Sequence, residues 1–306
     1  MDAAPRSLAT LLEGLVDYAG LFPPAALDMN AAAARYRRAR AGPHAAALAR
    51  FVVPAARLDE LALAGGDLPP GGEERWPLSA LVSSPIGADV ERIAAFNARH
   101  AGDTGWTPHV EAIEAKAASA GELQHARRAL PGCEVFVEVP LDGNTGRTLD
   151  TLAASGCRAK VRTGGTTVDA FPPVELLAGF LAGCASRRLP FKATAGLHHP
   201  VRGRHPVSYD AGAPRAAMHG FLNVFVAAAL LIGARIDEGA AAAVLREADP
   251  AAFLFEEERA GWKDRTITIG ELAEARRLAL GFGSCSFDEP MDDLAALGLI
   301  AAAPAP

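Results

Sequence analysis

Short apolar runs alternate with amphipathic stretches along most of this chain, and this alternation limits the fold more than any other feature. The apolar runs lie at 15–22, 48–54, 77–84, 108–116, 134–140, 158–165 and 190–196. Between them, the sequence predicts helices over 30–41, 56–64, 89–100, 120–130, 145–154 and 173–188. Strands that alternate with helices in this way indicate an α/β fold with a parallel sheet.

The spacing of the runs favours one kind of parallel sheet. They recur about every 25 to 35 residues, the length of one strand–helix unit in a (β/α)8 barrel. We therefore predict one catalytic domain over 1–306, a single (β/α)8 TIM-type barrel, in which "GGDLPPGGEE" (65–74) is a loop. A doubly wound open sheet is the alternative, but no GxGxxG follows the first run, which weakens a dinucleotide-binding interpretation.

The eighth strand has two candidates, "AFLFE" (252–256) and "GFGSCSF" (281–287), and we favour the second. That choice makes 236–270 an insertion before the last strand, with a hairpin in 251–269. Ahead of it we expect a loop over 197–214, then helices over 215–234 and 238–247.

The composition argues against nucleic acid and membranes as binding partners. Half of the 306 residues are hydrophobic, and the net charge of -6 comes without a basic stripe, which argues against nucleic-acid binding. The N-terminal "MDAAPRSLAT" lacks an apolar core, and the longest apolar run is too short to span a bilayer. The four scattered cysteines are typical of reduced thiols. We expect a cytoplasmic protein without a membrane partner, and homo-oligomerisation stays open.

Two of the apolar runs, "AKVRTGG" (159–165) and "FKATAG" (191–196), each contain a lysine and end on Thr and Gly. Strand alternation places Lys160 on one face with Arg162, and Lys192 on one face with Thr194. Buried charges are costly unless they are paired, and the carboxyl ends of barrel strands carry active sites. The lysines therefore predict a site at the barrel mouth, with an ion-paired layer that performs no chemistry as the alternative.

Paired lysines suit catalysis through an imine. A lysine must lose its proton before it attacks a carbonyl, and burial beside a second cation should lower the pKa of such a lysine. A nearby carboxylate can then move protons. Lys160, Lys192 and Glu138, from neighbouring runs, could supply these three roles.

These lysine–Thr–Gly endings resemble strands six and seven of deoxyribose-phosphate aldolase and its class I aldolase relatives. The stretch "LVDYAGLFPPAAL" (15–27) resembles the family's first strand, in which an aspartate precedes a loop that contains proline. The resemblance implies a lyase that makes or breaks a carbon–carbon bond, with Lys160 as the imine-forming residue and Lys192 as its activator. Asp17 then belongs to the catalytic group, and we expect neither a cofactor nor a metal.

Three features depart from the family pattern. The strand-four aspartate has no clear counterpart, because "HVEAIEAK" offers His109, Glu111 or Glu114. Arg162 stands where the family has a small hydroxyl residue. The closing Gly–Ser phosphate loop could correspond to "GFGSCS", but that stretch begins 85 residues after Gly196.

We expect a small anionic substrate. The candidate binding residues are Arg162, Thr194, His198, His199, Arg202, Arg204 and Ser284. Arginine side chains bind carboxylate or phosphate, and loops that follow barrel strands carry function. The loop 197–214 is therefore predicted to cover the barrel mouth, and loss of the charges of Arg202 and Arg204 is predicted to raise KM.

The main alternative is a metal-dependent lyase or hydrolase that uses the segment 198–219. This segment holds His198, His199, His205 and His219. His219 and Asn223 lie one helical turn apart, and with Glu138 or Asp17 they could bind a divalent metal, although no HxH or HExxH spacing is present. Two further alternatives are a Cys285 nucleophile and a non-catalytic barrel that binds an anionic metabolite.

Overall fold

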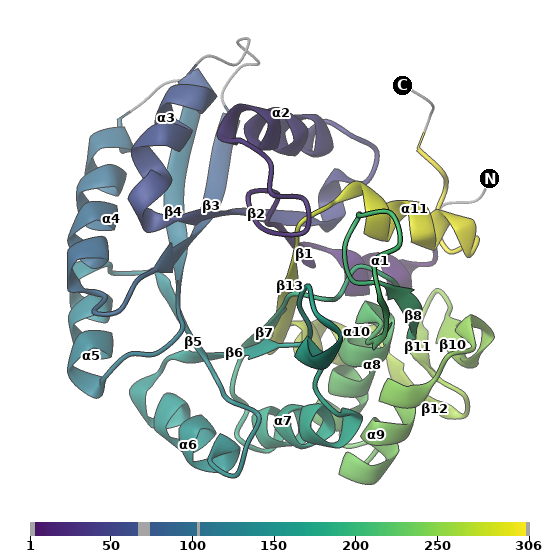
Figure 1. The fold of residues 1–306 in the computed structure, drawn as a ribbon. Coiled ribbons are helices and arrows are strands. Elements are labelled where there is room, and N and C mark those ends of the chain that lie inside the picture. The colour runs from purple at the N-terminus through teal and green to yellow at the C-terminus, as the bar shows by residue number, and fades with distance from the viewer. Residues whose placement is uncertain (1–3, 67–73, 103–104, 304–306) are drawn as a thin grey trace.

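The computed structural model describes residues 4–66, 74–102 and 105–303, and its centre is a closed barrel of parallel strands (Figure 1). The barrel strands are β1 (Val16–Tyr18), β2 (Leu48–Pro54), β3 (Glu74–Val82), β4 (Trp106–Ala115), β5 (Glu134–Glu138), β6 (Arg158–Arg162), β7 (Phe191–Thr194) and β13 (Ala279–Ser284). Strand β13 closes the ring between β7 and β1, so the prediction that "GFGSCSF" supplies the eighth strand is confirmed. The fold is the predicted (β/α)8 TIM barrel with an insertion before its last strand.

The helices surround the barrel (Figure 1). They are α1 (Arg6–Leu12), α2 (Met29–Arg40), α3 (Leu58–Gly66), α4 (Gly87–His100), α5 (Ala120–Ala129), α6 (Thr145–Ser155), α7 (Val174–Ser186), α8 (Phe221–Ile232), α9 (Glu238–Arg246), α10 (Ile269–Arg276) and α11 (Asp288–Ala296). Several helix ends are encoded locally. Capping boxes start α5 at Ser119 with Glu122 and α10 at Thr268 with Glu271, and Gly156 ends α6 in the left-handed conformation.

One segment, Val168–Ser186, is long and apolar enough to cross a membrane by length and composition alone. In this fold it comprises a 3-10 turn (Val168–Ala170) and helix α7, which packs against α8 and α9. Leu177, Phe180 and Leu181 of α7 are buried in the core of the domain. A core-facing helix therefore accounts for the high hydropathy of this segment.

The chain between β7 and β13 forms a hairpin, three helices and a small sheet. The strands are β8 (Gly203–Pro206), β9 (Arg215–Met218), β10 (Phe253–Phe255), β11 (Arg259–Trp262) and β12 (Arg265–Thr268). Strands β10 to β12 form a three-stranded antiparallel sheet where the sequence suggested a hairpin, and this sheet lies beside α8, α9 and α10 at one side of the barrel (Figure 1). Because α9, α10 and this sheet cover α8, the residues from Phe221 to Leu230 are all buried, which explains why this helix is apolar on every face.

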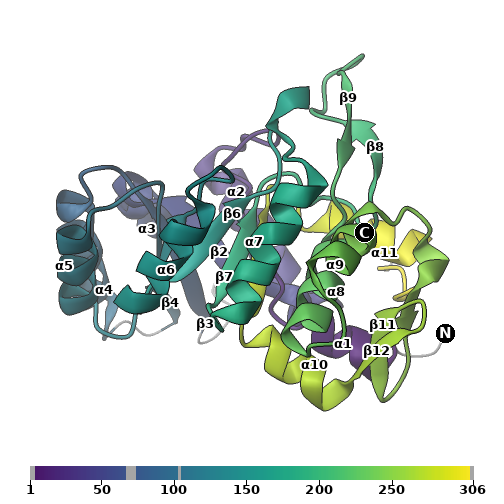
Figure 2. The same cartoon turned by 90° about the horizontal axis from the view of Figure 1, so that it is seen from below.

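The single helix predicted over 215–234 is wrong. Residues 215–218 form β9, which pairs with β8 in an antiparallel hairpin, and α8 begins only after Gly220 (Figure 2). Gly220 sits in a tight corner, since a Cβ there would lie 2.3 Å from Asn223 Oδ1 and 2.4 Å from the Pro200 carbonyl oxygen. The apolar pattern of the sequence runs on from β9 into α8 across Gly220. For this reason the pattern did not reveal where the strand ends and the helix begins.

Candidate active site

Two lysines on neighbouring strands point into the barrel. Lys160 on β6 and Lys192 on β7 are register partners, and their side chains are 6% and 2% exposed. Their strand neighbours Ala159, Val161 and Ala193 are fully buried in the core cluster on the other face of the sheet. The alternation of β6 and β7 thus brings both ammonium groups into the same interior space.

Glu114 on β4 lies between the two lysines. Its Oε1 accepts a hydrogen bond from Lys192 Nζ at 2.6 Å, and its Oε2 lies 2.9 Å from Lys160 Nζ. The Ser79 hydroxyl on β3 donates a further hydrogen bond to Oε1 at 2.7 Å. Residues from β3, β4, β6 and β7 therefore form one buried cluster, in which ion pairs and hydrogen bonds connect Ser79, Glu114 and the two lysines.

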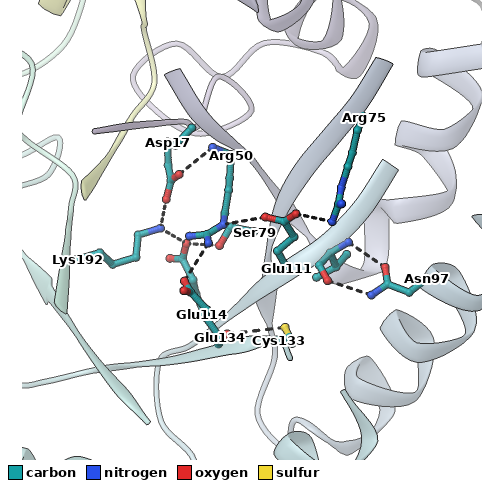
Figure 3. A network of polar contacts seen from close by, with 12 residues as sticks. Asp17, Arg50, Arg75, Ser79, Asn97, Glu111, Glu114, Cys133, Glu134 and Lys192 are labelled. Carbon is teal, nitrogen blue, oxygen red and sulfur yellow. Dashed lines mark hydrogen bonds and ion pairs between the residues drawn. The ribbon is translucent and has the colours of Figure 1, made fainter. Parts of the chain in front are cut away.

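Asp17 on β1 holds Lys192 from a second direction (Figure 3). Its Oδ2 accepts a hydrogen bond from Lys192 Nζ, and its Oδ1 accepts one from the backbone N–H of Arg50 at 2.9 Å. The Lys192 nitrogen also lies 5.4 Å from the centroid of the Phe136 ring. Two carboxylates and an aromatic face thus surround this ammonium group.

Glu138, at the end of β5, connects the cluster to its rim. Its Oε2 lies 3.7 Å from Lys160 Nζ, and its Oε1 lies 3.6 Å from Arg162 Nε. The Arg162 side chain is half exposed, whereas Glu138 is mostly buried. The structure therefore brings together Lys160, Lys192, Glu138 and Asp17, the four residues that the sequence assigned to catalysis.

The charges in the cluster stabilise one another. Burial opposes ionisation of Glu114, but the ammonium groups of Lys192 and Lys160 outweigh it and hold the pKa of this carboxyl well below its ordinary value. Burial also opposes the charge of Lys192, but Asp17 and Glu114 outweigh it and raise the pKa of Lys192. The sequence argument expected a lowered pKa, and for Lys192 it is wrong because two carboxylates lie closer than any cation.

The cluster opens onto a pocket of about 270 Å³. The lining residues are Ala19, Phe22, Pro23, Pro24, Val52, Leu81, Glu114, Lys160, Arg162, Gly165, Thr166, Lys192, Thr194, Ala195, Gly196, His198, Gly283 and Cys285. Most of these residues lie at the carboxyl ends of β1, β6, β7 and β13 or in the loops that follow, the face where barrel enzymes bind their substrates. The volume suits a small molecule.

Three of the predicted binding residues, Arg162, Thr194 and His198, line this pocket. Ser284 does not: it is buried, and its hydroxyl accepts a hydrogen bond from the Ser286 N–H at 3.4 Å. His199 also lies outside the lining, with Nδ1 2.6 Å from Asp293 Oδ2.

The two loop arginines also lie outside the pocket lining. Arg202 Nη1 lies 3.2 Å from His219 Nδ1, and Arg204 donates to the Arg215 carbonyl oxygen at 3.2 Å across the β8–β9 hairpin. Arg204 is an exposed residue of β8, in the hairpin that projects from the end of the barrel (Figure 2). Arg202 and Arg204 follow β7 closely in the sequence, but neither contributes to the lining of the pocket.

The connection between β8 and β9 does adjoin the pocket rim. Val207, Ser208 and Tyr209 line a small neighbouring cavity together with Pro24 and Gly165, which also line the main pocket. Part of the loop 197–214 therefore borders the barrel mouth, although its arginines do not.

The residues of the metal-binding hypothesis have other partners. His219 is buried, with Nε2 2.9 Å from the Pro172 carbonyl oxygen. Asn223 accepts a hydrogen bond from the Arg202 N–H and donates to the carbonyl oxygens of Val244 and Glu247. Within 4–66, 74–102 and 105–303, no three His, Cys, Asp or Glu side chains gather as a metal ion would require.

Glu114 and Ser79 are the site residues that sequence reasoning did not select. Glu114 was one of three candidates on its strand, beside His109 and Glu111. Simple alternation would have placed Glu114 on the opposite face from the other two, but a register shift between β3 and β4 at Leu78 and Ser79 breaks that alternation. Glu111 instead pairs with Arg75 at 2.8 Å, near the amino ends of the strands. No comparable signal marks Ser79 in the sequence.

A buried lysine–carboxylate cluster at the carboxyl face of a (β/α)8 barrel thus defines this chain. No protein-family model and no curated protein matches it. Among solved structures, it is similar to one described as "QR15, an Aldolase", with 12% sequence identity and a TM-score of 0.42, over 60% of this chain and 80% of that chain. A likeness this remote says nothing of activity, so a function must follow from the site itself.

Proposed function

We propose that this protein is an aldolase or lyase of the class I type, which cleaves or forms a carbon–carbon bond through an imine between Lys160 and a small anionic oxo compound. The observation that supports this most directly is the pair of buried lysines that share Glu114 beneath an open pocket. A pair of this kind offers one amine for covalent bonding and one fixed positive charge beside it.

The contacts favour Lys160 as the nucleophile. Lys192 is bonded to both Asp17 and Glu114, and its raised pKa keeps it charged. Lys160 has one carboxylate within hydrogen-bond distance, Glu114 at 2.9 Å, and is therefore held by fewer partners than Lys192.

The proposed reaction uses the cluster in sequence. The Lys160 nitrogen bonds to the carbonyl carbon of the substrate, and the carbonyl oxygen departs as water with the two protons that the Lys160 ammonium group gives up, beside the fixed charge of Lys192. In the cleavage direction, the hydroxyl of the departing fragment loses its proton to solvent and becomes a carbonyl group as that fragment leaves. The electron pair of the breaking carbon–carbon bond becomes the C=C bond of an enamine, and the positive imine nitrogen accepts the electron pair of its C=N bond. Protonation of that enamine and addition of water release the product and restore Lys160.

Arg162 is the residue that we expect to bind the anionic group of the substrate, because its half-exposed guanidinium stands in the pocket wall. For Arg162→Gln, the pyruvate concentration that gives half-maximal borohydride labelling should rise about tenfold, equivalent to about 1.4 kcal/mol for a charge-assisted contact. The matched control is Arg204→Gln, which removes an arginine outside the pocket lining and should leave this concentration unchanged. Equal values for Arg162→Gln and the wild type would exclude Arg162 from substrate binding.

A chelator separates the imine mechanism from the metal-dependent alternative. After dialysis against EDTA, the wild-type protein should retain its full borohydride labelling with a 2-oxo acid, because formation of the imine needs the Lys160 amine and no metal ion. Loss of labelling that added Zn²⁺ or Mg²⁺ restores would instead support a metal-dependent barrel enzyme. A chain that binds a 2-oxo acid but is never labelled would support the non-catalytic alternative.

A further inference from the structure

A second polar group reaches the pocket from outside the lysine cluster. His198, in the loop after β7, lines the pocket, and its Nδ1 lies 3.1 Å from Glu289 Oε2 in the first turn of α11. Tyr209, from the β8–β9 connection, donates a hydrogen bond to the same oxygen at 3.1 Å. Three segments far apart in the sequence thus converge on one imidazole–carboxylate pair.

The contacts of Glu289 fix how His198 is presented. Burial opposes ionisation of Glu289, but the nearby imidazole of His198 outweighs this and lowers the pKa of the carboxyl. The Glu289 N–H donates to Ser286 Oγ at 3.2 Å, which anchors the residue at the start of its helix. The Glu289 carboxylate lies 3.1 Å from Nδ1 outside hydrogen-bond geometry, and its negative charge favours a proton on that nitrogen, which leaves Nε2 as the nitrogen that can accept a proton from the substrate.

The lysine cluster lacks a group that readily both takes and gives a proton near neutral pH. The lowered pKa of Glu114 keeps it ionised, and the raised pKa of Lys192 keeps it charged. Histidine is the side chain whose ordinary pKa lies in this range. Among the described residues that line the pocket, His198 is the only histidine.

We propose that His198 is a catalytic acid–base residue that moves the proton on the carbon next to the imine carbon, and that Glu289 positions it. The inference rests on the proposed imine at Lys160. In the step from imine to enamine, Nε2 takes the proton, the C–H electron pair becomes the C=C bond, and the imine nitrogen accepts the electron pair of its C=N bond. The reverse step returns the proton to carbon, so no additional reactant is needed.

The pocket volume supports this assignment. Lys160 and His198 both line this one pocket of about 270 Å³, so both face the space that a compound bonded to Lys160 would occupy. The titratable and charged side chains around His198 are Glu289 from α11, Tyr209 from the hairpin, the adjacent His199, Cys285 after β13, and Lys160, Arg162 and Lys192 from β6 and β7.

The test uses two measurements with pyruvate: borohydride labelling, which reports imine formation, and exchange of the methyl hydrogens for deuterium, which reports proton transfer at the adjacent carbon. His198→Gln should keep labelling within a few-fold of the wild type and should lose about a hundredfold in exchange rate. Glu289→Gln should slow exchange while labelling is kept, because Glu289 no longer holds His198 in position, and Glu289→Asp should restore part of the exchange rate. The matched control is His125→Gln, since His125 pairs with Glu91 at 3.2 Å outside the pocket lining and should leave both measurements unchanged.

The outcomes separate this inference from the function on which it rests. Normal exchange in His198→Gln would overturn the role of His198 and leave the imine intact. Parallel loss of labelling and exchange would show that His198 binds the substrate or supports the fold, which also overturns the proposal. A wild-type protein that pyruvate, 2-oxobutyrate and acetaldehyde all fail to label would overturn the imine mechanism itself, and the role of His198 with it.

Discussion

Borohydride should label the wild-type chain at Lys160 in the presence of a 2-oxo acid and should leave Lys160→Met unlabelled. The reason is that reduction of an imine fixes the substrate carbon to the nitrogen that formed it, and methionine has no such nitrogen. Turnover of Lys160→Met should fall to background, because Lys192 is bonded to two carboxylates and cannot readily take over as nucleophile. Mass spectrometry of proteolytic peptides identifies the labelled residue.

Lys160→Arg is the control for folding in this experiment. Arginine retains a positive charge opposite Glu114 and so preserves the ion pair now measured at 2.9 Å, but it does not form the imine. We therefore expect this variant to be folded, unlabelled and inactive. Labelling at Lys192 in the wild type would reverse the roles of the two lysines, and activity in Lys160→Met would contradict the mechanism.

Strand periodicity could predict the barrel and the lysine pair because each follows from local rules. Alternation along β6 and β7 fixes the faces of Lys160 and Lys192, and parallel pairing then makes them register partners. Asp17 was selected by the resemblance of 15–27 to the first strand of the class I aldolases, and it reaches Lys192 from the end of β1.

The remaining features depend on geometry that periodicity does not contain. The register shift between β3 and β4 interrupts the alternation along β4, so periodicity could not identify Glu114 as the residue that contacts the lysines. The corner at Gly220 and the pairing of β8 with β9 turn the start of the expected helix into part of a hairpin, on which Arg204 is exposed outside the pocket lining. Such choices depend on contacts between segments that are distant in the sequence.

The repeated Thr–Gly endings have a structural cause in addition to a catalytic one. A Cβ on Gly164 would lie 2.9 Å from Gly196 Cα, so the two strand ends approach too closely for side chains there. The Thr163 hydroxyl donates to the Ala195 carbonyl oxygen at 2.5 Å and ties the same ends together. The sequence echo that drew attention to the lysines therefore also encodes how β6 and β7 meet at the barrel mouth.

Lys192→Met should destabilise the fold and slow the reaction together. Its ammonium group, 2% exposed, separates Asp17 from Glu114, and its removal leaves two buried carboxylates with less positive charge between them. Removal of one partner from a buried ion pair costs about 3 to 5 kcal/mol of unfolding free energy at neutral pH. Simple relief of repulsion between two lysines would predict a stable variant, but the contacts of Asp17 and Glu114 reverse that expectation.

The Lys192→Met protein that stays folded should also turn over substrate more slowly. Its turnover should fall at least about a hundredfold, roughly 3 kcal/mol, because the fixed charge beside Lys160 is lost.

The dependence on pH distinguishes this cause from a packing defect. In the wild type, the raised pKa of Lys192 means that its stabilising effect is present below the ordinary lysine pKa and is lost only as the pH rises through the higher folded-state value. In Lys192→Met, the deficit in unfolding free energy should shrink as the pH falls below neutrality, because a proton taken up by the carboxylate pair relieves its repulsion.

A second substitution, Asp17→Asn in the Lys192→Met background, should restore part of the stability, since the neutral amide at position 17 no longer repels Glu114. Denaturant titrations at several pH values measure these differences, with Lys263→Met as the matched control: Lys263 is 55% exposed, pairs with Glu247 at 2.9 Å, and should cost less than about 1 kcal/mol. A deficit in Lys192→Met that stays constant with pH and ignores Asp17→Asn would show that lost packing, rather than unpaired charge, destabilises the variant.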